Sequence, residues 1–363
     1  MKKPGMKPGE REQAQVFEIL KEGWKQVSGL DVLSESAEAE LRNLSKQIVE
    51  SAREGGEVQT GSWEDWKEWI SRFQNSLLWF DLDDYVRVMI RALLVNPEMT
   101  SEMTRADFGT SRQRDAAQSL TDTMRGYLGE LAVARFLKNK FNVEVELPTR
   151  RGSAKEFISS DIERIKMPGE DWRPPELSMS IKTTKFQGVW LEMPESQFKK
   201  SDVFVMVRLG ISRMHLIAFF KTISLIKGKI IPKGIEINEL DQETADVLWK
   251  ELPDFQPIPA YIVGFVERGH FREFLDPSIS KKKQSNQISI TIKHALGVFD
   301  RSRVIALVRR KYSRQLKLAR AKDSDFEVKI HRLNVPLRGR RFLASSGKLR
   351  FREEEWRDLV SRL

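Results

Sequence analysis

The stretch SMSIKTTKF, residues 178–186, has the alternation that decides the fold. Met179 and Ile181 alternate with polar residues, which is the period-two pattern of a β-strand with one apolar face. The polar positions are Ser178, Ser180 and Lys182. One face of the strand would therefore carry two hydroxyls and an ammonium group. The role of Lys182 depends on which acidic residues the fold brings beside it.

Further candidate strands and a long helix surround this stretch. The predicted strands are residues 143–147, 156–165, 177–183, 188–193, 202–209 and 214–220, with a later strand at 260–266 that would close the sheet. A helix is predicted from about Ala116 to Lys140, and it is apolar on more than one side. These elements predict an α/β (α+β) fold, with a mixed central β-sheet flanked by helices.

Two carboxylates precede Lys182 in the order helix, then strand. Glu130 lies within a largely apolar face of the predicted helix, where a carboxylate is costly to bury unless it is paired or binds a cation. Asp161 follows in the predicted strand FISSDIERI. The arrangement resembles the PD-(D/E)xK nuclease superfamily, which includes type II restriction endonucleases, resolvases and repair nucleases. The resemblance covers about residues 110–270 and rests on element order, element type and spacing.

The chain departs from this pattern at Ser180, which stands where the family has an acid two residues before the lysine. Restriction enzymes that recognise sites containing CCGG are similar, because a following element supplies their missing acid. The candidates here are Glu195 and Glu192. We favour Glu195, which follows Pro194 at a predicted helix start, over Glu192 in the middle of a short strand.

The resemblance implies a Mg²⁺-dependent site with assigned roles. Asp161 would bind the metal directly, Glu130 and Glu195 would complete its coordination, and the Ile181 carbonyl would add a ligand, since Mg²⁺ prefers oxygen ligands. Lys182 would orient or help to deprotonate the attacking water. The predicted catalytic residues are Glu130, Asp161, Ser180, Lys182 and Glu195.

Each of these residues also has a purely structural interpretation. Glu130 would pair with Arg135, Asp161 would cap a turn, and Lys182 would lie on a solvated edge together with Lys185.

The positive charge is concentrated late in the chain. The net charge is +10, yet residues 1–100 hold 13 basic and 18 acidic side chains, whereas residues 271–363 hold 24 and 10. Such a surface attracts polyanions, here double-stranded DNA. The alternative is a basic helix that packs on the acidic first region.

The predicted DNA contacts come from several segments. A helix capped by Asp300 would carry four basic residues on one face, and RGRRFLASSGKLRF is predicted to form a hairpin with SSG as its turn. The predicted DNA-binding residues are Arg112, Arg114, Lys185, Arg303, Arg310, Arg314, Lys317, Arg338, Arg340 and Arg341.

The chain divides into three predicted regions. Residues 1–105 form a helical region with helices at 13–27, 37–53 and 62–73, residues 106–278 form the nuclease core, and residues 279–363 form a basic DNA-binding region of helix and strand. Trp63, Trp66 and Trp69 recur every third residue, which favours a packed helical face over base stacking.

Several classes of protein are disfavoured. There is no GxxxxGK(S/T) loop, so no nucleotide cofactor is expected. No apolar run approaches the roughly 18 residues of a membrane span, which predicts a cytoplasmic protein without membrane contact. The absence of cysteine excludes disulfides and thiolate metal sites.

The sequence therefore predicts a Mg²⁺-dependent, sequence-specific double-stranded DNA endonuclease of the type II restriction kind. Cutting both strands of a symmetric site takes two active sites, which predicts a homodimer. Two alternatives remain: a structure-selective resolvase or repair nuclease, and a DNA-binding protein on a degenerate nuclease fold in which Ser180 marks lost catalysis.

Overall fold

The computed structural model describes residues 9–94, 116–148, 160–272, 274–281, 287–312, 322–333 and 340–363. Its helices are α1 (Glu10–Ser28), α2 (Glu35–Gly55), α3 (Trp63–Asn75), α4 (Leu82–Leu94), α6 (Ala116–Phe141), α7 (Glu195–Phe198), α8 (His215–Thr222), α9 (Ile231–Glu236), α10 (Gln242–Glu251), α11 (Arg301–Lys311) and α13 (Glu353–Val360). Its strands are β1 (Leu77–Phe80), β2 (Glu144–Glu146), β3 (Arg164–Lys166), β4 (Met179–Lys185), β5 (Trp190–Pro194), β6 (Val203–Leu209), β7 (Ile258–Glu267), β8 (Phe274–Lys281), β9 (Ile288–Phe299), β10 (Phe326–Ile330) and β11 (Arg341–Ser345).

The first three helices begin and end where local signals predict. Ser34 caps α2 by accepting a hydrogen bond from the Ala37 N–H, and Ser62 caps α3 by accepting one from the Asp65 N–H. Gly29 and Gly56 end α1 and α2 with positive φ angles of 68° and 77°, a conformation that glycine adopts without strain. The three predicted helices of this region are confirmed.

The central sheet is mixed, with strand order β1-β7-β6-β4. β4 runs parallel to β6, with Lys182 opposite Met206, whereas β7 is antiparallel to both β6 and β1. The prediction of a mixed sheet flanked by helices is confirmed. The strand predicted at 260–266 forms β7, but it does not close the sheet, because β1 pairs along its other side and is the outer strand there.

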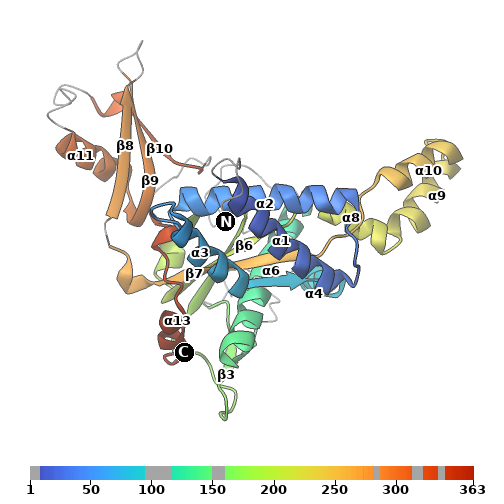
Figure 1. Ribbon diagram of the computed structural model, residues 1–363, viewed down its shortest axis with the longest axis horizontal. Coiled ribbons are helices and arrows are strands. Elements are labelled where there is room, and N and C mark those ends of the chain that lie inside the picture. Colours follow the sequence, from blue (N-terminus) through green and yellow to red (C-terminus); the bar gives the residue numbers. More distant parts are fainter. Residues whose placement is uncertain are drawn as a thin grey trace.

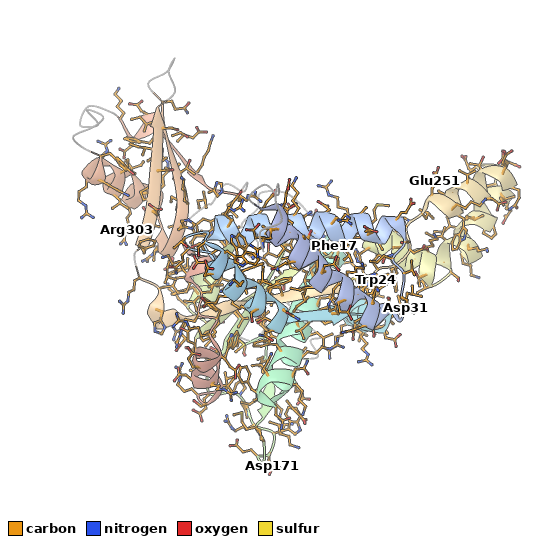
Figure 2. All side chains as sticks on the ribbon, viewed as in Figure 1. Phe17, Trp24, Asp31, Asp171, Glu251 and Arg303 are labelled. Carbon is orange, nitrogen blue, oxygen red and sulfur yellow. The ribbon has the colours of Figure 1, made fainter. Side chains whose placement is uncertain are left out.

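Helices cover both faces of this sheet (Figure 1). On one face, α6 packs against β4 in a core that includes Leu128, Ile181 and Val205. On the other face, α1, α2 and α3 cover a core that includes Phe204 and Met206. The tryptophans of α3 belong to this second core: Trp66 and Trp69 are buried and Trp63 is partly buried, so the packing interpretation is confirmed. Phe17 and Trp24 of α1, labelled in Figure 2, are buried in the same core.

A second sheet has the order β10-β9-β11-β5, with β8 also paired to β9. β11 joins the two sides of this sheet because it is antiparallel to both β5 and β9. α11 packs on β8, β9 and β10, and these elements stand away from the central sheet at the upper left of Figure 1. We call the described residues between 274 and 333 the basic projection.

Strand pairing crosses the predicted region boundaries. β1 of the first region pairs with β7, β11 of the last region pairs with β5, and β8 itself spans residue 278. β8 and β9 pair with each other across the boundary predicted at residue 278, with Lys281 opposite Ile288.

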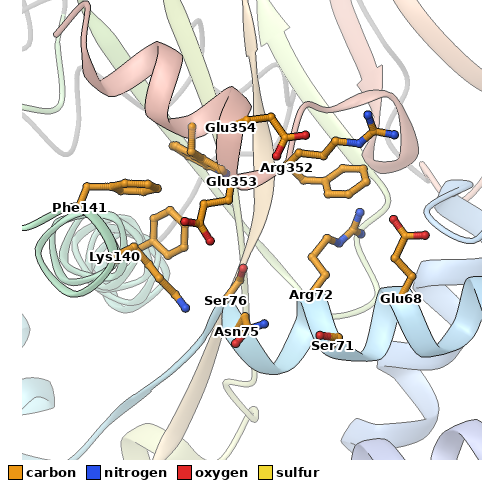
Figure 3. A pocket seen from close by; sticks show the side chains of 13 residues that line it. Glu68, Ser71, Arg72, Asn75, Ser76, Lys140, Phe141, Arg352, Glu353 and Glu354 are labelled. Atoms are coloured by element: carbon orange, nitrogen blue, oxygen red, sulfur yellow. The ribbon is translucent and has the colours of Figure 1, made fainter.

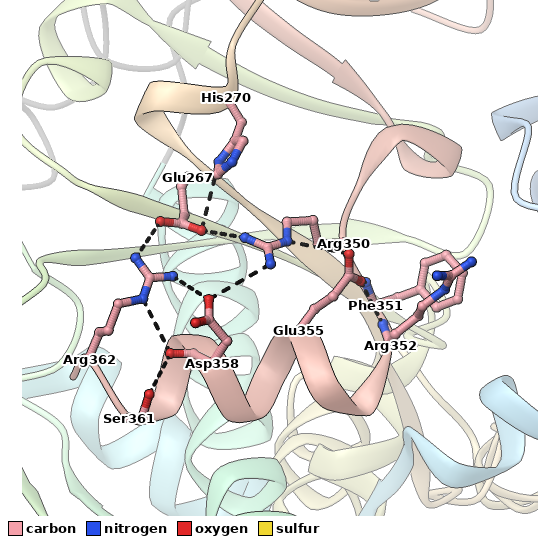
Figure 4. A network of polar contacts seen from close by, with 9 residues as sticks. All are labelled: Glu267, His270, Arg350, Phe351, Arg352, Glu355, Asp358, Ser361 and Arg362. Atoms are coloured by element: carbon pink, nitrogen blue, oxygen red, sulfur yellow. Dashed lines mark hydrogen bonds and ion pairs between the residues drawn. The ribbon is translucent and has the colours of Figure 1, made fainter.

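Salt bridges fasten α13 to the end of β7 (Figure 4). The Glu267 carboxylate accepts from Arg350 Nη1 at 2.6 Å and from Arg362 Nη1 at 2.8 Å. The hydrogen bond from Arg362 is the largest of the effects that hold the pKa of Glu267 below its ordinary value. Trp356 of α13 is buried against α6 and β7 in the core of the first face.

Two local predictions were wrong. Residues 214–220 form helix α8 rather than a strand, and their buried positions, His215, Ala218 and Phe219, follow helical spacing within an apolar run too short for periodicity to decide. The predicted hairpin around SSG is also absent from the described chain: β11 pairs with β5 and β9, residues 346–348 form a 3₁₀ turn, and Arg350 bridges to Phe265.

No helix in the described residues is long and apolar enough to span a membrane.

Candidate active site beside strand β4

Asp161 lies along the edge of β4 that β6 leaves open. Its N–H donates to the Met179 carbonyl at 2.7 Å, and its Oδ2 accepts from the Ile181 N–H at 2.7 Å. The aspartate is therefore fixed to β4 directly before Lys182. Residues 156–159 of the strand predicted here lie outside the described residues, and the described strand that follows is β3.

A pocket of about 490 Å³ opens beside β4. Its walls come from the N-terminal half of α6, from β4 and β5, and from α7. The pocket therefore extends around the open edge of β4, from the face that α6 covers to the opposite face. Four basic side chains and two acidic ones line it: Arg125, Lys182, Lys185, Arg341, Asp122 and Glu192. The excess of basic groups makes the pocket suited to an anion such as phosphate.

Lys182 is oriented by α7. Its ammonium group donates to Gln197 Oε1 at 2.7 Å, and α7 is held in place by Phe198, which stacks on Phe342 and Phe204. Lys182 therefore points into the pocket and does not lie on a solvated edge. Gln197 was not predicted from sequence, because only the fold brings α7 against β4.

Of the two candidate acids, Glu192 lines this pocket and the preferred Glu195 does not. Burial raises the pKa of Glu192, and Arg341, 3.7 Å away, and Lys182 only partly oppose that effect. Glu195 instead pairs with Lys199 at 3.0 Å and with Arg340 at 3.6 Å. Glu192 is therefore the candidate acid that lies close to Lys182 in the pocket.

Glu130 and Lys182 lie on different faces of β4. A Cβ built at Gly129, the neighbour of Glu130, would lie 2.0 Å from Thr183 Oγ1, so α6 faces the side of β4 that carries Ile181 and Thr183. Ser180 and Lys182 face the opposite way by strand alternation. Glu130 is only 7% exposed, and the predicted partner Arg135 donates to Asp84 at 2.7 Å.

Lys185 sits among other cations at the pocket. Burial lowers its pKa, Arg125 and Arg213 lower it further, and Asp122 acts in the opposite sense. Sequence reasoning missed Arg125 and Arg213, since neither belongs to a motif and only tertiary packing brings them to β4.

The other predicted DNA-binding residues fall into three groups. Arg341 is 6% exposed and lines the pocket, and Arg340 contacts Glu195. Arg303 and Arg310 are exposed on α11. The remainder lie outside the described residues: Arg112, Arg114, Arg314, Lys317 and Arg338.

The sequence left open that the basic helix near the C-terminus packs on the acidic N-terminal region. In the structure, other residues make the contact between these two regions. α11 packs on its own sheet, whereas α2 contacts β9, the 3₁₀ turn at residues 346–348, and residues 331 and 332. His331 Nε2 lies 2.9 Å from Glu54 Oε2, and Arg332 Nη2 donates to Glu54 Oε1 at 2.7 Å.

The carboxylates of the site are few for a metal centre. Within the described residues, no group of three or more histidine, aspartate or glutamate side chains is placed to hold a metal ion. Mg²⁺ nevertheless binds through one or two carboxylates when water and substrate phosphates supply its other ligands. Asp161, which is fixed to the edge of β4, and Glu192, which lines the pocket, are the acids that we consider for that smaller donor set.

A second pocket, of about 500 Å³, lies between α3, α13 and the C-terminal end of α6 (Figure 3). Arg72, Lys140 and Arg352 line it, but so do three glutamates, Glu68, Glu353 and Glu354. These opposite charges balance, so the pocket beside β4 is the better candidate for a phosphodiester.

Comparison with protein-family models, with curated proteins and with solved structures finds no match for this chain.

Proposed function

We propose that this protein is a Mg²⁺-dependent endonuclease that hydrolyses phosphodiester bonds in double-stranded DNA, in the manner of a type II restriction enzyme. The observation that carries the proposal is the pocket beside β4. There Lys182 donates to Gln197, and the acidic Glu192 and three further basic side chains line the same pocket. Asp161 is fixed to the adjoining edge of the same strand.

In this proposal the basic groups of the pocket bind the phosphate. Arg125, Lys185 and Arg341 would neutralise the bound backbone, and Lys182 would orient the attacking water and meet the negative charge that develops in the transition state. Asp161 and Glu192 would hold Mg²⁺, which supplies Lewis-acid stabilisation of the phosphate and an activated water. A cation beside Glu192 would favour its ionised form against the effect of burial.

The basic projection would supply contacts to the DNA outside the pocket. Arg303 and Arg310 are exposed on α11 and carry charge toward solvent. Contacts of this kind would position the duplex through its phosphates and would add affinity that depends on salt.

One observation favours a second candidate, a DNA-binding protein without catalysis. The described residues lack a cluster of three metal-binding side chains, and Ser180 is buried where the related pattern has an acid. Such a protein would bind DNA through the same basic groups and leave it intact.

The test is digestion of long, unmethylated phage DNA by the purified protein in Mg²⁺, with parallel EDTA reactions. Discrete bands that disappear in EDTA and with Lys182→Ala are expected, and sequencing their ends gives the recognition site. Lys46→Ala removes an exposed lysine on α2, away from the pocket, and should cut as the wild type does.

The same assay separates the alternatives. Cleavage confined to branched or damaged substrates indicates a structure-selective nuclease. Intact DNA in every lane, together with a mobility shift, indicates a non-catalytic binder. Comparing Glu192→Gln with Glu195→Gln then decides which acid acts: the first should abolish cutting and the second should preserve it.

A further inference from the structure

A second projection leaves the molecule on the side opposite the basic projection. It consists of residues 215–251, which we call the helical arm: α8 begins it, and α9 and α10 stand away from the sheet at the right of Figure 1. Glu251, the last residue of α10, is labelled on the arm in Figure 2. The arm has a small core of its own, formed by Ile226, Ile231 and Ala245.

The helical arm exposes large aliphatic side chains. Ile223 is 45% exposed, Ile230 53%, Ile237 54% and Val247 48%. Ile230 and Ile237 are seven residues apart across α9, so they lie on the same side of the helix. Exposed aliphatic residues that gather on one projecting element are typical of a surface that another protein covers.

Charge on the helical arm is divided along the sequence. The segment 215–235 contains four lysines and no acidic residue, and the segment 236–251 contains six acidic residues and one lysine. The lysines are Lys221, Lys227, Lys229 and Lys233, and the acidic residues are Glu236, Glu239, Asp241, Glu243, Asp246 and Glu251. One half of the arm is therefore the electrostatic complement of the other half.

We propose that the helical arm is the surface through which two copies of this chain associate about a two-fold axis. In an isologous contact the same patch serves both copies, so the basic half of one arm meets the acidic half of its partner. The exposed isoleucines would be buried between the two arms, and the paired charges would fix their register.

The charge pattern argues against two other occupants of this surface. A nucleic acid would be repelled by the acidic segment 236–251, and an anionic membrane would be repelled in the same way. A second copy satisfies both halves at once. The inference stands on the helical arm alone and does not require the proposed nuclease activity.

The first test measures the mass of the full-length protein by sedimentation velocity over a range of concentrations. The wild type should be a dimer, and Ile230→Asp/Ile237→Asp should raise the dissociation constant by about tenfold or more. Val32→Asp is the matched control, because Val32 is an 80% exposed aliphatic residue between α1 and α2. Circular dichroism confirms that the variants remain folded.

A charge exchange gives the sharper test. Lys227→Glu/Lys229→Glu leaves the segment 215–235 with two lysines and two glutamates, and Glu239→Lys/Asp246→Lys leaves the segment 236–251 with three lysines and four acidic residues. Each variant loses the charge of one half of its arm, so each alone should be monomeric. An equimolar mixture should form a heterodimer because the two arms are then complementary. A monomeric wild type, or a dimer that both sets of substitutions leave intact, would overturn the proposal. A dimer that fails to cut DNA would refute the nuclease proposal and leave this one standing.

Discussion

Lys182 is positioned by a neutral acceptor on α7. Its ammonium group donates a hydrogen bond of 2.7 Å to Gln197 Oε1. Gln197 is therefore a positioning residue in the proposed reaction.

Replacing Gln197 by leucine should slow cleavage more than it weakens binding. A misplaced lysine costs transition-state stabilisation, so the single-turnover rate should fall by about tenfold or more while the affinity for DNA stays within about twofold. Rapid quench and fluorescence anisotropy measure the two quantities. Gln26→Leu, an exposed change on α1, is the control. Equal losses of rate and affinity would contradict a positioning role.

Glu57 forms the most deeply buried ion pair described in the chain. Its carboxylate lies 2.6 Å from Arg208 Nη1 and 2.7 Å from Arg72 Nη2, and it accepts from Trp69 Nε1 at 2.9 Å. Burial raises the pKa of Glu57, but the two guanidinium groups and the hydrogen bond from Trp69 lower it, and the net effect places the pKa below its ordinary value of 4.5.

Breaking this cluster should be costly. Glu57→Gln leaves Arg208 buried without its counter-charge, so the free energy of unfolding should fall by about 3 to 5 kcal/mol. Urea denaturation at neutral pH measures the loss. The exposed Glu64→Gln should change it by less than about 0.5 kcal/mol, and a similar change in both variants would refute the argument.

The lowered pKa of Glu57 also predicts an acid dependence. Its ionised form stabilises the fold above about pH 4.5, and that contribution is lost as the pH falls through the lower pKa of the folded state. The difference in unfolding free energy between wild type and Glu57→Gln should therefore shrink below pH 4.5. A difference that stays constant down to the acid transition would contradict this.

At the scale of elements, two glycines of α6 differ in the space around them. A Cβ at Gly129 would lie 2.0 Å from Thr183 Oγ1, whereas a Cβ at Gly126 would meet nothing within 4 Å. The first glycine lets the helix approach β4, and the second leaves room in the pocket.

Alanine at the two positions should act in opposite directions. Gly129→Ala should destabilise the protein by about 1 to 3 kcal/mol through overpacking, whereas Gly126→Ala should stabilise it by up to about 1 kcal/mol through helix propensity. Thermal unfolding gives both signs. Thr183→Ala should recover part of the loss in Gly129→Ala, and no recovery would show that the helix is spaced by another contact.

Sequence predicted those elements whose signals are local. The helix predicted at 62–73 and the strand predicted from the alternation in 178–186 match α3 and β4, because caps and periodicity act over a few residues. The predicted hairpin in 338–351 failed because β11 takes its partners from β5 and β9, which are remote in sequence. The surroundings of Glu195 and Glu192 could not be predicted for the same reason, since only the fold shows that Glu195 contacts Arg340 and Lys199 while Glu192 lines the pocket.

At the scale of the whole molecule, the two parts that project from the body differ in charge. The basic projection and the helical arm lie at opposite ends of the long axis in Figure 1, with the pocket beside β4 on the body between them. DNA bound by this protein would therefore engage the body and the basic projection.

Removing charge from α11 should change how DNA affinity responds to salt. Arg303→Ala/Arg310→Ala should reduce the slope of log affinity against log salt concentration by about 0.9 for each lost phosphate contact. Titrations at several salt concentrations measure the slope. Lys46→Ala/Lys67→Ala, on the acidic first region, should leave it unchanged. An unaltered slope in the α11 variant would show that α11 does not contact the DNA phosphates.

The pairing of β1 with β7, in which Leu77 lies opposite Tyr261, also restricts the order in which the protein can fold during its synthesis. α1, α2 and α3 leave the ribosome early, yet the strands β6 and β7 that they cover are made much later. The apolar faces of these helices, which carry several tryptophans, stay uncovered until β6 and β7 have been synthesised. Exposed apolar surface in a nascent chain is prone to aggregate. We therefore expect translation speed and chaperone supply to affect the yield of folded protein.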